Sequence, residues 1–155
     1  MDPRSERNIV LALALAKAPD VLFERVWAMV FSGQSQWGRF LSNCGFSAVV
    51  DLEDQLPIEV SATANGVLSM PCPKGKLGQE AYHHAMRGVN PVGPGSALLY
   101  ASGQTTAAKL VITDHAWSGA DGHRYVAVCD CGSRTVYPEL VDDLDSSYTF
   151  LIRQI

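Results

Sequence analysis

The sequence has few charged residues and no cluster of basic ones. Charged side chains make up 18% of the 155 residues, and the formal net charge is −4 at pH 7. The 12 lysines and arginines are scattered along the chain, whereas proteins that bind nucleic acids gather basic residues on one face or stripe. A nucleic-acid partner is therefore disfavoured.

The sequence also lacks a hydrophobic run long enough to span a membrane. Its most apolar early stretch, Ile9 to Ala16, is too short to cross a bilayer. Asp2 and Glu6 precede this stretch, where a signal peptide has basic residues, and Lys17 interrupts it. We interpret Ile9 to Ala16 as part of a buried helix, and we expect neither an export signal nor a membrane span.

Cysteine is scarce, and two common catalytic motifs are missing. The four cysteines, at positions 44, 72, 129 and 131, do not form a disulfide framework in a chain of this length. The segment Gly93 to Gly95 lacks the Lys-Ser/Thr of a phosphate-binding loop. A serine nucleophile elbow of the type G-x-S-x-G is also absent.

Apolar side chains are abundant enough to build one hydrophobic core. Hydrophobic residues make up 47% of the chain, and the charged fraction lies below the usual quarter. A compact fold is therefore expected instead of a disordered chain. The length is typical of one domain, so we predict a single domain over residues 1–155.

The first part of the sequence predicts helices. Glu6 to Phe31 fits one long helix or two, because Pro19 ends a helix and Asp20 can cap the next one. Ser32 to Asn43 is polar and contains glycine. Cys44 to Leu56 fits either a helix that starts at Cys44 or a strand, because its apolar run is short and β-branched.

The second part predicts a sheet. Pro57 to Pro73 is mostly irregular, Gly78 to Gly88 favours an exposed helix, and Asn90 to Gly95 is a turn. Five short apolar runs follow: Ala97 to Tyr100, Leu110 to Ile112, Tyr125 to Val128, Thr135 to Tyr137 and Tyr148 to Ile152. We therefore expect an α+β fold with N-terminal helices packed on a C-terminal antiparallel β-sheet.

The stretch from Thr113 to Gly132 holds the strongest candidates for chemistry. A polar turn leads into His123 at the start of a strand, where the imidazole is free to meet a partner from elsewhere in the chain. The candidate partner is Cys44. If Cys44 starts a helix, the helix dipole favours its thiolate. One imidazole could then serve as base and as acid, oriented by Asp130 or, failing that, by Ser133.

Other interpretations of the same residues stay open. His115 is a competing base in this stretch. Cys44 could simply pack in the core, as free cysteines usually do, and Trp117 could be a packing anchor. The last two alternatives describe a protein without a catalytic site.

Cys129 and Cys131 allow a third interpretation, a small zinc-stapled regulator. Cys72 with His83 or His84 could complete four ligands. Zinc sites usually pair their ligands as C-x-x-C, however, and no such pair exists here. A metal site is therefore the weaker interpretation, and we predict none.

Three stretches resemble the peptidoglycan amidase effectors of bacterial type VI secretion, which are papain-like cysteine hydrolases of the NlpC/P60 type. The segment FLSNC, which ends at Cys44, resembles their nucleophile region. The segment HAWSGADGH, from His115 to His123, is similar to the family's H-x-W-S-x-A-x-G-H segment, whose second histidine is the base. The third stretch is the apolar strand after His123, which is followed by a turn with cysteine and glycine and later by the aromatic C-terminal strand Tyr148 to Ile152.

The resemblance implies a papain-like fold and cleavage of an amide in the peptide stem or cross-link of peptidoglycan, without a cofactor. Cys44 would be the nucleophile, His123 the base and Asp130, by position only, the third catalytic residue. Asn43, His115 and Trp117 would contact substrate.

The resemblance also implies a place of action and partners. The chain would be made in the cytoplasm without a signal peptide, delivered to the periplasm of a target cell by the type VI apparatus, and blocked in the producer by a cognate immunity protein. The alternative from another class is a non-catalytic binding module, such as an immunity or adaptor protein.

Overall fold

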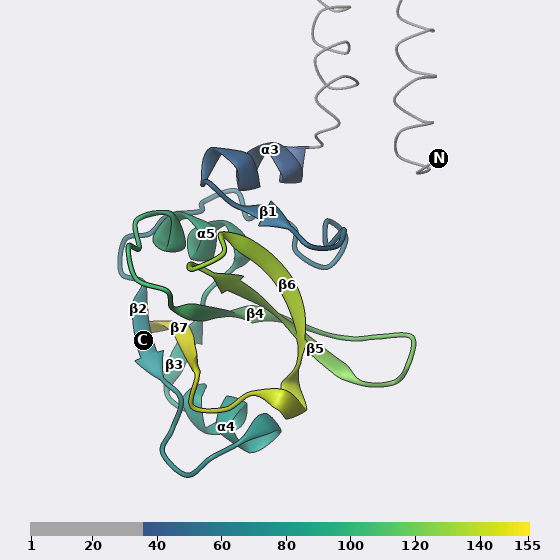
Figure 1. Ribbon diagram of the computed structural model, residues 1–155. Coiled ribbons are helices and arrows are strands. Elements are labelled where there is room, and N and C mark those ends of the chain that lie inside the picture. The colour runs from purple at the N-terminus through teal and green to yellow at the C-terminus, as the bar shows by residue number, and fades with distance from the viewer. Residues whose placement is uncertain (1–35) are drawn as a thin grey trace, which may run out of the picture. The chain divides into compact units, whose positions relative to one another are not determined.

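Seven strands form one curved sheet in the computed structural model, which describes residues 36–155 (Figure 1). The strands are β1 (Ser47–Ala48), β2 (Leu68–Pro71), β3 (Val89–Pro91), β4 (Lys109–Ser118), β5 (Arg124–Asp130), β6 (Thr135–Leu140) and β7 (Tyr148–Gln154). Three α-helices and one 3₁₀ turn accompany them in this part of the chain: α3 (Gln36–Asn43), α4 (Gly78–Ala85), α5 (Pro94–Ser102) and η1 (Val141–Asp143). The predicted α+β class is confirmed, whereas the predicted helices of Glu6 to Phe31 lie outside the described residues.

Strands β4, β5 and β6 form an antiparallel meander in the middle of the sheet. Val111 pairs with Val128 across β4 and β5, and Val128 pairs with Tyr137 across β5 and β6. β-branched and aromatic residues suit such a pleated and buried surface. Four of the five predicted strands are confirmed, because their apolar runs lie inside β4, β5, β6 and β7.

The sheet is mixed and not purely antiparallel, which corrects the prediction. Its order is β1-β6-β5-β4-β7-β2. β4 runs parallel to β7, and β1 runs parallel to β6. β2 pairs with one edge of β7. The other edge of β7 pairs first with β4, through Tyr148 to Phe150, and then with β3, through Ile152 to Gln154. These neighbours are distant in sequence, and local patterns do not specify them.

The predicted strand Ala97 to Tyr100 is wrong, because these residues lie inside helix α5. Gly93 precedes the helix and Pro94 begins it, and proline suits the first turn of a helix because that position needs no N–H donor. A short apolar run fits a buried strand and a buried helix equally well. Here Pro94, at the first position of α5, favours the helix.

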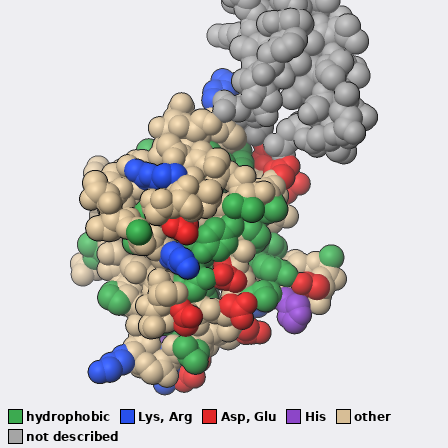
Figure 2. All heavy atoms as spheres, viewed as in Figure 1, with side chains coloured by type: hydrophobic (Ala, Val, Ile, Leu, Met, Phe, Trp, Pro, Cys, Tyr) green, Lys and Arg blue, Asp and Glu red, His purple; other side chains and the backbone are tan. Residues whose placement is uncertain are grey.

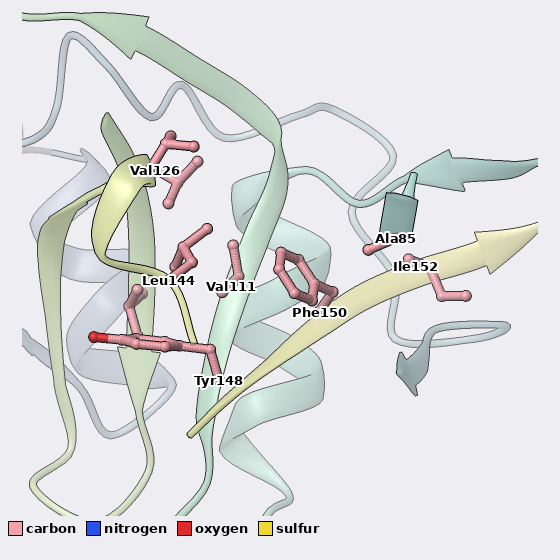
Figure 3. Packing of buried hydrophobic residues seen from close by; sticks show 9 residues of the cluster. Ala85, Val111, Val126, Leu144, Tyr148, Phe150 and Ile152 are labelled. Atoms are coloured by element: carbon pink, nitrogen blue, oxygen red, sulfur yellow. The ribbon is translucent and has the colours of Figure 1, made fainter. Parts of the chain in front are cut away.

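One face of the sheet packs against α4 and η1. Phe150 and Val111 lie side by side at its centre, with Ala85 of α4 and Leu144 after η1 around them (Figure 3). Phe150 is fully buried, and burying a side chain of this size contributes about 1.5–3 kcal/mol. This cluster fixes the meander against the helix that precedes it.

The other face of the sheet packs against α5, which contacts β4 and β5. Val126 and Val128 face the cluster around Phe150, so the alternation of a strand turns Ala127 and Cys129 toward the α5 side. Phe40–Ile155, which contains the sheet and the helices on its two faces, forms one compact unit. Within residues 36–155, no helix is both long and apolar enough to cross a bilayer.

Candidate functional site

Cys44 lies at the C-terminal end of a helix and not at its start. The N–H of Gly45 donates to the Ser42 carbonyl at 3.0 Å, and the N–H of Phe46 donates to the Leu41 carbonyl at 2.9 Å. Gly45 has a positive φ of 80°. This pair of bonds with a left-handed glycine is the Schellman motif that closes a helix, so Cys44 is the C-cap of α3.

The environment of Cys44 disfavours its thiolate. Only 8% of the residue is exposed, and burial raises the pKa of its thiol. The C-terminal end of a helix is the negative end of its dipole, which also opposes a nearby anion. Cys44 therefore does not start a helix, which was one of the two structures expected for Cys44 to Leu56.

Cys44, Cys129 and Cys131 lie close together, where β1 meets the ends of β5 and β6. The N–H of Ser47 donates to the Arg134 carbonyl at 3.0 Å, and β1 pairs with the start of β6. Cys129 is fully buried at the β5 end that β6 joins. Burial and the neighbouring Cys131 and Cys44 raise the pKa of Cys129. The four cysteines all lie within the described residues and are free thiols.

His123 lies at the tip of the β4–β5 hairpin, which projects beyond the rest of the sheet in Figure 1. Its N–H donates to Asp121 Oδ1 at 3.0 Å, and its carbonyl accepts from the Gly119 N–H at 2.8 Å. The residue is exposed. The backbone of His123 is thus held on both sides while its imidazole faces solvent.

The structure does not bring Cys44 and His123 together. Cys44 lies beside the Asp130 end of β5, and His123 lies at the opposite end, immediately before Arg124. β5 has seven residues, so its two ends are about 20 Å apart. A general base must lie within hydrogen-bond reach of its nucleophile. The expected catalytic dyad is therefore not assembled in this conformation.

Asp130 does not orient His123 either. It lies at the far end of β5, where its Oδ1 accepts from the N–H groups of Gly132 and Ser133 at 2.9 and 3.3 Å. These bonds cap the turn between β5 and β6, a common use of aspartate. Asp130 thus caps this turn, away from His123, and its role as the third catalytic residue stays a prediction. Asn43 ends α3 beside Cys44 and is exposed.

His115 and Trp117 lie on β4, in the projecting hairpin with His123. His115 Nδ1 lies 3.5 Å from Asp114 Oδ2 and has no hydrogen-bond partner among the described residues. Trp117 stacks on Tyr125, its cross-strand partner, with ring centroids 6.1 Å apart and planes 22° apart. Three of the predicted site residues thus share one structural element.

Tyr125 and Asp121 are the residues of this hairpin that the sequence did not single out. The Tyr125 hydroxyl donates to Asp121 Oδ2 at 2.5 Å, and this bond together with the His123 N–H lowers the pKa of Asp121. A Cβ on Gly119 would lie 2.6 Å from the Tyr125 ring. The ring therefore lies directly on the turn backbone. Aspartate before glycine is the signal that marks this turn.

Figure 2 shows histidine, acidic and hydrophobic side chains gathered at the projecting side of the molecule. In the described part of the chain, no group of three or more His, Cys, Asp or Glu side chains has an arrangement that could hold a metal ion. Comparison with known protein families, curated proteins and solved structures found no match.

Proposed function

We propose that this chain is a non-catalytic binding module whose contact surface is the β4–β5 hairpin. The observation that supports this proposal best is the position of Cys44, buried beside one end of β5, while His123 lies exposed beyond the other end. A nucleophile and a base at opposite ends of a strand about 20 Å long cannot exchange a proton in this conformation. Binding, in contrast, needs only the hairpin.

The hairpin has the properties of a preorganised contact surface. The bonds of Asp121 to His123 and Tyr125 order its tip, and the stacked pair of Trp117 and Tyr125 stiffens the strands below. Ordering before contact lowers the entropy lost on binding. Aromatic side chains are enriched among residues that dominate binding energy, and His123 adds an exposed donor and acceptor.

The ligand we propose for this surface is peptidoglycan, on the strength of the likeness of His115–His123 to the effector segment. A cognate immunity protein is the proposed protein partner for the same reason. Both proposals concern the hairpin and leave the cysteines as core residues.

The second proposal is the type VI peptidoglycan amidase itself, acting in the periplasm of a target cell and papain-like in fold. One observation favours it over other enzymes. The segment that carries the likeness is one continuous hairpin, in which His115 faces the Asp114 carboxylate. This proposal requires a rearrangement that brings Cys44 to His123.

Purified Gram-negative sacculi test both proposals in one experiment. Wild type, Cys44→Ala, His123→Ala and, as matched control, His83→Ala are incubated with sacculi. Sedimented protein is measured, and the masses of any released fragments are recorded. His83 is an exposed histidine on α4, outside the hairpin sequence.

The binding module predicts equal sedimentation of wild type, Cys44→Ala and His83→Ala, with no fragments. It also predicts at least about fivefold weaker binding of His123→Ala, the cost of losing a contact of about 1 kcal/mol. Fragments from wild type but not from Cys44→Ala would establish the amidase instead. Folded protein that neither sediments nor releases fragments would exclude peptidoglycan as the ligand.

A further inference from the structure

The segment Pro57–Ala64 crosses the start of α5 as an irregular strap between two buried anchors. Leu56 before it and Val67 after it are 1% and 6% exposed, whereas Val60 in its middle is fully exposed. Among the described residues, residues 57–63 contain only a turn at residues 60–61 and make no backbone–backbone hydrogen bond to another segment. The strap therefore depends on side chains for its position.

Glu59 supplies the main attachment. Its Oε2 accepts from the N–H of Gly95 at 2.9 Å, and its Oε1 accepts from the N–H of Ser96 at 2.6 Å. These N–H groups belong to the first turn of α5, where no earlier helical carbonyl can accept them. A carboxylate is favoured there by charge-assisted bonds and by the helix dipole.

Two glycines make room for this contact. A Cβ on Gly93 would lie 2.7 Å from Glu59 Oε2, and a Cβ on Gly95 would lie 2.7 Å from Ala62 Cβ and 3.0 Å from Ile58 Cγ2. The strap lies directly on the backbone at the start of α5. The Gly-Pro-Gly sequence is thus explained by the strap that covers it.

The remaining polar attachments meet at Thr63. Its N–H donates to Ser96 Oγ at 3.1 Å, and its carbonyl accepts from Arg153 of β7. Like Glu59, Thr63 is partly exposed. Segments held by a few partly exposed hydrogen bonds open at a lower free energy than the core of a domain.

We propose that Pro57–Ala64 is a latched strap, which Glu59 holds closed and which opens as a unit without unfolding of the sheet. Opening frees the N–H groups of Gly95 and Ser96 and uncovers the small backbone turn beneath Ile58 and Ala62. The device is independent of the hairpin and of its proposed ligand.

Amide hydrogen exchange, followed by NMR on the full chain, tests the strap. Glu59→Ala removes both acceptors, and Glu59→Gln keeps one neutral acceptor. We expect the Gly95 and Ser96 amides to exchange at least about fivefold faster in Glu59→Ala, the effect of losing a helix cap worth about 1 kcal/mol. Glu59→Gln should lie between Glu59→Ala and wild type.

Gly95→Ala opens the strap by a different route, because its methyl group displaces Ala62 and Ile58. This substitution should also speed up the hydrogen exchange of the Thr63 and Ser96 amides. Gly103→Ala is the matched control at the other end of α5, since its Cβ would meet only Tyr100 O at 3.7 Å.

Two results would overturn the proposal. One is unchanged exchange of Gly95 and Ser96 in Glu59→Ala, which would mean that the carboxylate holds nothing. The other is equal acceleration of the Val126 and Val128 amides in the core, which would mean that the whole domain opens and the strap is no separate unit.

Discussion

Replacing Thr113 by valine should destabilise this fold strongly, although the change in side-chain volume is small. Thr113 is 3% exposed. Its Oγ1 accepts from the Val92 N–H at 2.8 Å and donates to the Leu151 carbonyl at 2.7 Å. One hydroxyl therefore joins β4 to β7 and to the residue that follows β3.

The size of the effect follows from the groups that lose their partner. Valine matches threonine in shape, so no cavity forms. The buried Val92 N–H and Leu151 carbonyl lose this bond, and each unsatisfied buried group costs about 1–3 kcal/mol. We expect a loss of roughly 2–4 kcal/mol in the free energy of unfolding, a large part of the 5–15 kcal/mol typical of a domain.

Urea unfolding followed by circular dichroism measures this loss. Thr113→Ser keeps both bonds and should lose only about 1 kcal/mol for the missing methyl group. Thr149→Val is the matched control, because Thr149 is half-buried on β7 and its hydroxyl has no hydrogen-bond partner among the described residues. The reasoning is refuted if Thr113→Val unfolds at the wild-type urea concentration, or if Thr149→Val loses as much.

Two further predictions concern other parts of the fold. Gly45→Ala should lower the free energy of unfolding in urea by about 1–2 kcal/mol, because the left-handed φ of 80° strains any residue with a Cβ. That Cβ would meet no other atom, so the effect comes from the backbone alone. An unchanged free energy of unfolding would contradict the Schellman assignment. Burial raises the pKa of Glu59, but hydrogen bonds from Ser96 and Gly95 outweigh it and leave the pKa below its usual value. The lowered pKa means that the charge of Glu59 stabilises the fold above about pH 4.3, the unfolded value, and that this contribution is lost as pH falls through the lower folded value. The stability difference between wild type and Glu59→Gln should therefore be larger at neutral pH than in acid, and an equal difference at both would contradict the assignment.

Much of the sheet could be predicted from the sequence, because local sequence patterns mark its central strands. The runs at Val111 and Val128 are β-branched and bounded by turns, and they pair as neighbours along the chain. Pairings between distant segments, such as β1 with β6, depend on tertiary packing and leave no local pattern. Gly45 carried a usable signal, since a glycine after a polar helical stretch marks a helix end.

The candidate site was predictable only in part. The turn before His123 and the strand after it follow from Asp121, Gly122 and the apolar run beyond. A base and its nucleophile, in contrast, have no fixed spacing in sequence, so the distance between Cys44 and His123 could come only from the fold. Tyr125 was recognisable as a strand residue, but its stacking on Trp117 depends on the register of the hairpin.

The most direct test of the central claim is the labelling rate of Cys44 near neutral pH, with and without His123→Ala. A thiol reagent is added to the native protein, and the labelled cysteines are identified by mass spectrometry. The account predicts that Cys72, which is half-buried, is labelled first. Cys44 should be labelled slowly, because it is buried and the pKa of its thiol is raised. His123→Ala should leave both labelling rates unchanged. Fast labelling of Cys44 that slows in His123→Ala would show that the two residues meet, and it would contradict the binding-module account.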